Sequence, residues 1–153
     1  MHCTAQSIDL LDNQLSAAID LYIRSKHARW IMSGPTFIAI HRLLDELADV
    51  AASYADKIAE RAAALVGTAH DPAPVVAERS FLPAYRFDIA DKNAQIGVVS
   101  RALAAFGDSL HRAIAETARI GDGDTEDLFR EVSRGIDYYC WLVESHDKLA
   151  SRP

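Results

Sequence analysis

The stretch that decides the fold reads ARWIMSGPTFIAIHRLLDELADVAASYADKIAE and spans residues 28–60. From its proline onward, apolar residues recur at spacings of three and four, which is typical of a helix with one side in a core. These residues are Phe37, Ile40, Leu44, Leu47, Ala51, Tyr54, Ile58, Ala62 and Leu65. Gly34 can adopt a positive φ and Pro35 suits a first helical turn, so we expect a helix from Thr36 to about Val66.

The rest of the chain repeats this helical periodicity, and strand-like alternation is almost absent. Further helices are expected over residues 8–31, 89–120 and about 125–149, the last with Asp124 or Thr125 as its N-cap. Three prolines within residues 70–88 indicate a long connection, with one short helix near residues 75–79. The pattern predicts an all-α single domain over residues 1–153, a four-helix bundle of ferritin-like topology with one long crossing connection.

Composition excludes several classes of protein. The chain has 153 residues, of which 50% are apolar, enough for one domain with a core. No apolar run approaches the roughly 20 residues that span a bilayer, and the first residues lack a signal-peptide pattern. Two cysteines do not make a disulfide framework, so we expect a reducing, cytoplasmic setting. A net charge of −6 gives no general attraction to nucleic acid or anionic lipid.

One face of the helix over residues 36–66 carries polar residues in place of apolar ones. At 100° per residue, these fall together: His41, Asp45, Asp49, Asp56 and Glu60. A solvated surface explains such a stripe without any ligand. However, small residues crowd the helix over residues 48–55, and small residues suit helices that approach each other closely. Alanine is also the best helix former, so both interpretations remain open.

The polar positions are arranged symmetrically along the helix. The midpoint between His41 and Glu60 coincides with that between Asp45 and Asp56, and it falls beside Val50. Within one chain the two pairs lie roughly 22 Å apart and cannot share a metal ion. A twofold axis near Val50 would pair two antiparallel copies and create two equivalent sites, each with ligands from both chains. Imidazole together with several carboxylates favours iron or manganese.

The motifs in this region resemble those of the Dps family, the DNA-binding proteins from starved cells, which are miniferritins of the ferritin-like superfamily. The resemblance is strongest in ARWIMSGPTFIAIHRLLDEL (residues 28–47). It continues in DKIAER (residues 56–61) and in SRGIDYYCWLVESH (residues 133–146), and it covers nearly the whole chain. The resemblance implies hollow shells of twelve subunits, built from twofold dimers.

The resemblance also implies an activity. His41, Asp45, Asp56 and Glu60 match the family's catalytic metal ligands, which oxidise Fe(II) to Fe(III), typically with hydrogen peroxide. The ferric mineral collects inside the shell, which protects the cell against oxidative stress. We therefore expect a ferroxidase-type oxidoreductase with iron as its metal, if the site is active in this sequence.

Arg29 departs from the family pattern, which has a ligand histidine before the tryptophan. Arginine stays protonated and offers no lone pair to a metal ion. We expect its guanidinium to face Asp56 and Glu60 of the partner subunit and to pair with them. Either Arg29 swings away and a weaker site survives, or it occupies the cavity and oxidation is slow or absent. His27 lies about 200° around the helix and should not substitute.

The second outcome defines an alternative function. The protein would be a structural ferritin-like shell with an inactive ferroxidase site, in which an Arg29–carboxylate bridge replaces the metal. Beside the site, Lys26 matches a family lysine, although a solvated lysine explains it equally well. Trp30 is either a flanking residue that intercepts oxidising equivalents, as the resemblance suggests, or a packing aromatic at a helix end.

Acidic residues near the last predicted turn match the threefold pores of the family. They are Asp122, Asp124, Asp127 and Glu131. In a trimer each would form a ring of three carboxylates that draws Fe(II) inward, although helix-start capping explains some of them as well. DNA binding is expected to be weak or absent, because the predicted tails carry few cations to release phosphate counterions.

Overall fold

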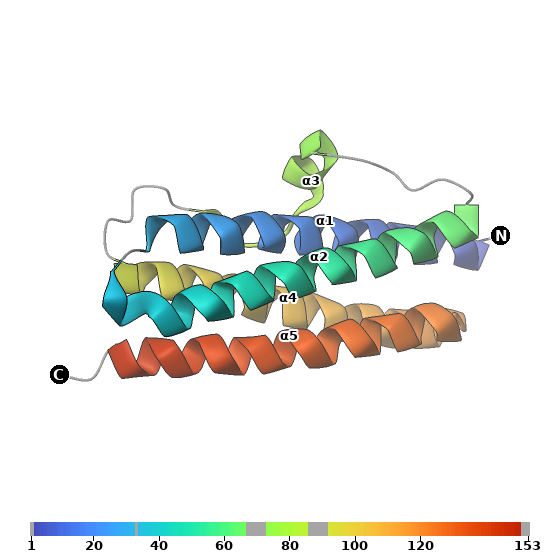
Figure 1. The fold of residues 1–153 in the computed structure, drawn as a ribbon. Helices are drawn as coiled ribbons and strands as arrows, with labels where there is room; N and C mark the ends of the chain where they lie inside the picture. Colours follow the sequence, from blue (N-terminus) through green and yellow to red (C-terminus); the bar gives the residue numbers. More distant parts are fainter. Residues whose placement is uncertain (1, 33, 67–72, 86–91, 151–153) are drawn as a thin grey trace.

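The computed structural model describes residues 2–32, 34–66, 73–85 and 92–150. Within these ranges the chain is helical and contains no strand (Figure 1). The helices are α1 His2–Ile31, α2 Ile38–Val66, α3 Ala73–Arg79, α4 Lys92–Ile120 and α5 Gly123–Ala150, and one turn of 3₁₀-helix, Pro35–Phe37, precedes α2. The predicted all-α fold is confirmed, including the short helix in the long connection.

The long helices form two antiparallel pairs, α1 with α2 and α4 with α5. Contacts of α1 with α4 and of α2 with α5 close the bundle. Because α2 and α4 run in the same direction, the chain between them returns along the bundle, with α3 packed on α1 (Figure 1). One long crossing connection of this kind distinguishes the ferritin-like bundle from a simple up-and-down bundle. Within the described ranges, every helix is too polar or too short to cross a lipid bilayer.

The core is built from large apolar side chains of all four long helices. Those that are almost completely buried are Leu11, Leu21, Met32, Leu44, Leu47, Ile58, Leu103, Phe106, Leu110, Phe129 and Ile136. Burying one such side chain contributes about 1.5–3 kcal/mol. Three of them, Leu44, Leu47 and Ile58, belong to α2, which is therefore held along its length as a rigid support for its outer face.

The helices α2 and α5 are in close contact where Tyr54 packs over Gly135. A Cβ atom added at Gly135 would lie 1.7 Å from the Tyr54 hydroxyl and 2.8 Å from its ring carbon Cζ. Only glycine therefore fits under the phenol ring in this arrangement. The crossing fixes the position of α5 against the middle of α2.

Two predicted helix boundaries are wrong. Helix α1 begins at His2 and not near Ile8, because the small and polar residues before Ile8 continue the helix without an apolar signal. The N-cap of α5 is Asp122. Its carboxylate accepts hydrogen bonds from the Thr125 backbone N–H at 3.2 Å and the Thr125 hydroxyl at 2.6 Å.

The cause of the second error is Gly121, whose φ of 78° turns the chain directly after α4, so that α5 starts earlier than expected. The predicted positive φ of Gly34 is confirmed at 109°. The predicted start of a helix at residue 89 lies outside the described residues, which show α4 from Lys92 onward.

Candidate functional site

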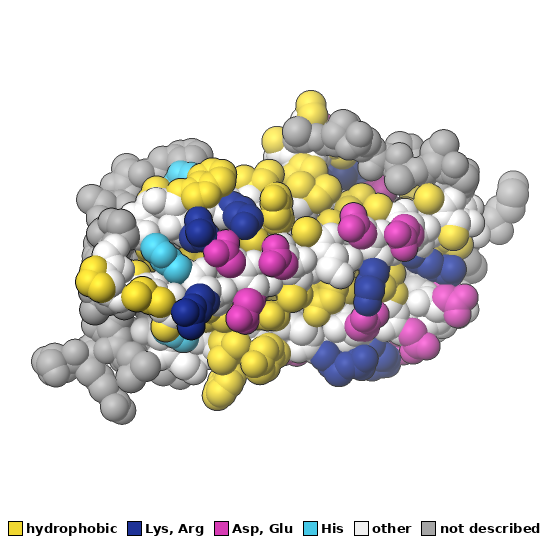
Figure 2. All heavy atoms as spheres, in the orientation of Figure 1, with side chains coloured by type: hydrophobic (Ala, Val, Ile, Leu, Met, Phe, Trp, Pro, Cys, Tyr) yellow, Lys and Arg dark blue, Asp and Glu magenta, His cyan; other side chains and the backbone are white. Residues whose placement is uncertain are grey.

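The outer face of α2 carries the predicted polar stripe (Figure 2). His41 and Asp45, near the start of the helix, are partly buried, whereas Asp49, Asp56 and Glu60 are exposed. Figure 2 shows acidic side chains spread along this face, with basic side chains toward both ends and a histidine near one of them. The structure therefore brings the stripe to one surface but divides it into two halves with different surroundings.

In the first half, Asp45 lies between two cations of α1. Its carboxylate oxygens lie 3.1 Å from Lys26 Nζ and 2.7 Å from Arg29 Nε. Partial burial works to raise the pKa of Asp45, but the hydrogen bonds and charges of Lys26 and Arg29 outweigh this effect and lower the pKa. Asp45 is therefore ionised at neutral pH, and its negative charge is already balanced within its own chain.

The imidazole of His41 is also engaged within the chain. Its Nε2 atom makes a hydrogen bond with the backbone carbonyl of Met32, the residue that follows α1. A carbonyl oxygen only accepts, so Nε2 carries the proton, and in the neutral ring Nδ1 keeps the lone pair. His41 thus fastens the turn between α1 and α2. While this bond holds, Nδ1 is the nitrogen that can bind a metal ion.

The second half of the stripe is open. Asp56 and Glu60 stand one helical turn apart, both are exposed, and neither makes an ion pair with a described residue. The cations beside them point elsewhere: Lys57 pairs with Glu131 of α5, and an Arg61 Nη atom lies 2.9 Å from Asp122. These two carboxylates therefore remain available to a cation from outside the chain.

One chain alone does not assemble the predicted site. Among the described residues, no three His, Cys, Asp or Glu side chains come close enough to hold a metal ion. His27 does not replace the missing ligand histidine, because its Nδ1 lies 2.5 Å from the Tyr85 hydroxyl, away from Asp45. That a second copy supplies the remaining ligands stays a prediction of the sequence.

Arg29 has a partner that the sequence did not indicate. The sequence predicts that Arg29 pairs with Asp56 and Glu60 of a partner subunit, whereas within the chain its Nε donates to Asp45. Contact with the partner's carboxylates stays a prediction, but Asp45 now competes for the same guanidinium. Lys26, which the sequence left as either a site residue or a solvated lysine, also contacts Asp45. Trp30, next to Arg29, is 67% exposed and so does not pack in the core of the chain.

The predicted pore residues have unequal surroundings. Asp122 caps α5. Burial works to raise the pKa of its carboxyl group, but the Ser7 side chain, Thr125 and Arg61 together lower it. Asp124 is exposed and lies 3.7 Å from Arg61 Nη1. Asp122 therefore does not project as an unpaired acid, and Asp124 is only loosely balanced by Arg61.

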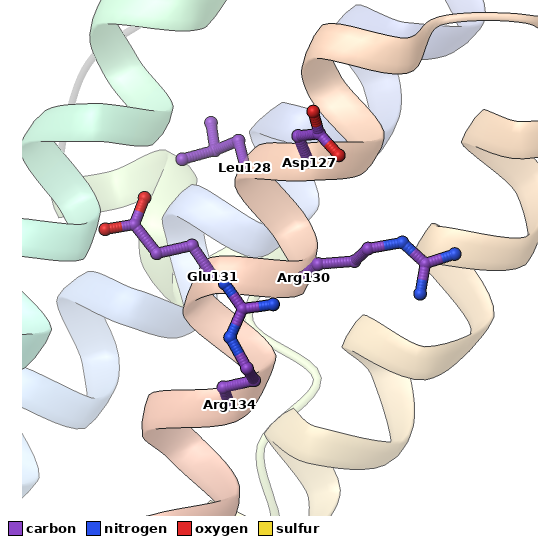
Figure 3. Close-up of a pocket in the computed structure, with 5 residues that line it drawn as sticks. All are labelled: Asp127, Leu128, Arg130, Glu131 and Arg134. Carbon is purple, nitrogen blue, oxygen red and sulfur yellow. The ribbon is translucent and has the colours of Figure 1, made fainter.

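The other two pore candidates border an open hollow of about 490 Å³ on α5 (Figure 3). Its lining is Asp127, Leu128, Arg130, Glu131 and Arg134. Glu131 extends toward α2, where Lys57 pairs with it, and Arg130 extends to the other side. Asp127 is exposed and makes no ion pair with a described residue. Two arginines stand on this surface, so it is of mixed charge and not purely acidic.

Three functional contacts were missed by the sequence analysis: the Met32 carbonyl, Lys57 and Arg61. A backbone acceptor leaves no trace in the residue type. Lys57 and Arg61 directly follow Asp56 and Glu60 in the sequence, which predicts that both are exposed. Which carboxylates they contact depends on how α2 packs against α5.

Comparison with known proteins gives a consistent result. A family model described as a ferritin-like domain matches residues 8–152. The chain is 33% identical over 139 residues to a DNA protection during starvation protein of Agrobacterium fabrum, covering 91% of this chain and 86% of that protein. It is 30% identical over 149 residues to the protein of the same name from Mycolicibacterium smegmatis, covering 90% and 75%.

Solved structures agree with this result. The structure of DpsC from Streptomyces coelicolor superposes with a TM-score of 0.91 at 29% identity, covering all of this chain and 88% of that one.

Proposed function

This chain belongs to the Dps family of ferritin-like proteins, and from that premise we propose that it oxidises Fe(II) and stores the ferric product in a hollow shell. Family membership supports iron storage and protection against oxidative stress in general. The shell would be a homo-oligomer of twelve subunits built from twofold dimers. Direct binding of DNA would be weak, because the net charge of the chain is −6.

One observation carries the proposal: the two half-sites on the outer face of α2. His41 and Asp45 form one half, Asp56 and Glu60 form the other, and neither is a metal site alone. Two antiparallel copies crossing near Val50 would bring unlike halves together twice. Each resulting centre would contain one imidazole and three carboxylates, a ligand set that favours iron or manganese.

In the proposed reaction, Fe(II) is the substrate. Asp56 and Glu60 of one subunit would hold a first Fe(II) ion, and His41 and Asp45 of the other would complete a second, weaker position. Each ion gives one electron to hydrogen peroxide, which takes up two protons and leaves as two water molecules. This removes both reagents from which hydroxyl radicals form.

Oxidation by the purified, assembled protein tests the proposal. Fe(II) is added without oxygen, peroxide follows, and the ferric absorbance is recorded by stopped flow. We expect rapid oxidation by the parent protein and its loss in Glu60→Ala. The matched control is Glu78→Ala, which removes an exposed carboxylate on α3 and should oxidise Fe(II) like the parent. Equal rates in parent and Glu60→Ala would contradict the proposed site.

Lys26 and Arg29 together hold the carboxylate of Asp45, an arrangement called here the Asp45 clamp. This clamp favours a second candidate, the structural shell with an inactive site. Lys26 and Arg29 place two positive charges where a second Fe(II) ion would sit. In that case the parent protein would oxidise Fe(II) no faster than buffer. The shell would nevertheless assemble in the presence of a chelator, because charge pairs and not metal would hold the dimer.

A further inference from the structure

A row of three rings leads from the candidate site into the interior of the protein. The exposed indole of Trp30 meets the imidazole of His27 edge to face, with 6.5 Å between ring centroids. The imidazole in turn meets the phenol ring of Tyr85, at 5.1 Å and nearly perpendicular. Trp30 follows Arg29 directly in sequence, so the outer end of the row begins at the Asp45 clamp.

Hydrogen bonds hold the inner end of the row. The Tyr85 hydroxyl lies 2.5 Å from His27 Nδ1 and 3.2 Å from Oε1 of Gln95, which is buried on α4. The phenol can donate its single proton to Gln95 Oε1, or to His27 Nδ1 when the imidazole carries its own proton on Nε2. The row therefore joins three segments of the chain: α1, the connection after α3, and α4.

The surroundings fix the phenol ring in place. The Arg24 guanidinium lies 5.6 Å from the Tyr85 ring centroid, and it also donates to the Pro83 carbonyl. Arg24 is buried and makes two hydrogen bonds to the carboxylate of Asp20, at 2.9 and 3.0 Å. The negative charge of Asp20 offsets the positive charge of the guanidinium, which alone would oppose removal of an electron from the phenol ring.

Such a phenol–imidazole pair is suited to coupled loss of an electron and a proton. A phenol that loses an electron must also lose its proton to become a stable neutral radical. Burial raises the pKa of Tyr85, so the proton stays on the phenol until the electron leaves. The His27 Nδ1 atom, within hydrogen-bond reach of the phenol, can accept that proton as a general base.

We infer that Trp30, His27 and Tyr85 form a redox relay that moves a one-electron oxidising equivalent from the exposed indole to a partly buried tyrosine. A one-electron oxidant of the hydroxyl-radical class removes an electron from the Trp30 indole. The indole radical cation takes an electron from Tyr85, whose proton passes to His27 Nδ1. Trp30 is restored, and a neutral tyrosyl radical beside an imidazolium ion remains.

The relay is reset by one electron. A reductant such as Fe(II) reduces the tyrosyl radical and becomes Fe(III), and His27 returns the proton to the phenol oxygen. In this way one damaging equivalent would oxidise one further Fe(II) ion. That role rests on the proposed function, whereas the relay itself needs only a surface oxidant.

The first test contains no iron. Photogenerated tris(bipyridine)ruthenium(III) oxidises the assembled protein, and time-resolved absorbance and freeze-quench electron paramagnetic resonance follow the radicals. The background is Trp141→Phe, which leaves Trp30 as the only indole in the chain. We expect an indole radical that decays while a tyrosyl radical grows, more slowly in D₂O because a proton moves in the same step.

Three variants in this background assign the signal. Tyr85→Phe keeps the ring and should lose the tyrosyl phase that follows indole decay. His27→Gln should lose most of the D₂O effect and slow that phase. Tyr138→Phe removes an exposed tyrosine of α5 and should leave the phase intact. Circular dichroism and shell size confirm that each variant is folded.

The outcomes separate the relay from the proposed function. A tyrosyl phase of equal size in Tyr85→Phe and parent would overturn the relay, whatever the protein does with iron. If that phase is lost in Tyr85→Phe but the parent does not oxidise Fe(II), the relay stands and the ferroxidase proposal fails. If both hold, treatment with Fe(II) and peroxide should leave more oxidised Trp30 in Tyr85→Phe than in parent, as measured by peptide mass spectrometry.

Discussion

The two halves of the α2 face differ in how far each is completed by its own chain. In the first half, His41 and Asp45 already have partners, namely the Met32 carbonyl, Lys26 and Arg29. In the second half, Asp56 and Glu60 project into solvent without an ion pair to any described residue. Each half contains an aspartate on the same face of the same helix, although only the first half adds an imidazole.

This difference teaches that ligand chemistry alone does not decide how strongly a position attracts a metal ion. A carboxylate that is balanced by two cations offers an incoming Fe(II) ion less than an unbalanced one does. The second half is therefore expected to bind first and more tightly. The first half would bind only as Arg29 and Lys26 release Asp45.

The largest effect is expected from breaking the support that both halves share. Gly135→Ala would place a methyl group against the Tyr54 ring, and overpacking of this kind costs about 3 kcal/mol. We expect a lower melting temperature by calorimetry and partial recovery on adding Tyr54→Leu. Gly123→Ala is the control, since a Cβ there meets nothing within 4 Å. Equal destabilisation by both substitutions would contradict the close crossing.

A second substitution, Arg29→His, would give the first half an additional metal ligand in place of a cation. Arg29→His removes one cation from Asp45 and adds an imidazole, so the rate of Fe(II) oxidation should rise by about tenfold or more. The measurement is stopped-flow ferric absorbance at limiting Fe(II). Arg112→His, at an exposed position of α4, is the control. An unchanged rate in Arg29→His would show that the clamp does not limit the site.

The third prediction concerns the anchor of the second half. Arg61 ties the end of α2 to Asp122, which caps α5. Asp122→Asn keeps the cap but replaces hydrogen bonds to a carboxylate by hydrogen bonds to a neutral amide. We expect the free energy of unfolding to fall by about 1 kcal/mol. Because the pKa of folded Asp122 is lowered below 3.8, its contribution is complete above that pH and is lost as pH falls through the folded pKa.

Denaturant unfolding at several pH values measures this contribution. The free energy of unfolding of parent and Asp122→Asn should differ near pH 7 and converge once the pH falls below the lowered pKa of folded Asp122. A difference that is constant across this range would assign the effect to packing and not to charge.

The smallest effect is expected where the charges are most exposed. Arg29→Ala removes a hydrogen bond from Asp45 and should raise the pKa of that carboxyl group, as followed by NMR of its side-chain carbon. The free energy of unfolding should change by less than about 0.5 kcal/mol, because both side chains are more than a third exposed. Lys57→Ala, which acts on Glu131, should leave the titration of Asp45 unchanged.

Sequence patterns predicted the fold well because helical periodicity is a local property. The apolar spacing over residues 36–66 placed the core residues of α2 correctly, and Pro35 and Gly34 marked its start. The N-cap of α5 was predicted less well. Asp122, Asp124 and Thr125 are all suitable capping residues, and only the positive φ of Gly121 selects the first of them.

The site was predicted only in part, because partners across the fold are not local. Spacing placed His41, Asp45, Asp56 and Glu60 on one face, and the structure shows them there. That Arg29 reaches Asp45 depends on how α1 crosses α2. The sequence alone therefore could not show that one half of the face is balanced within the chain.

The arrangement of the bundle as two helical hairpins has a consequence for folding. Within each hairpin, α1 with α2 and α4 with α5, the contacts join residues connected by a short turn, whereas contacts between hairpins span the long connection. Local contacts lose less loop entropy and form faster. We expect each hairpin to form early and their docking to be the slow step. Pulse-labelled hydrogen exchange should then protect α2 before the buried interface of α1 with α4 is complete.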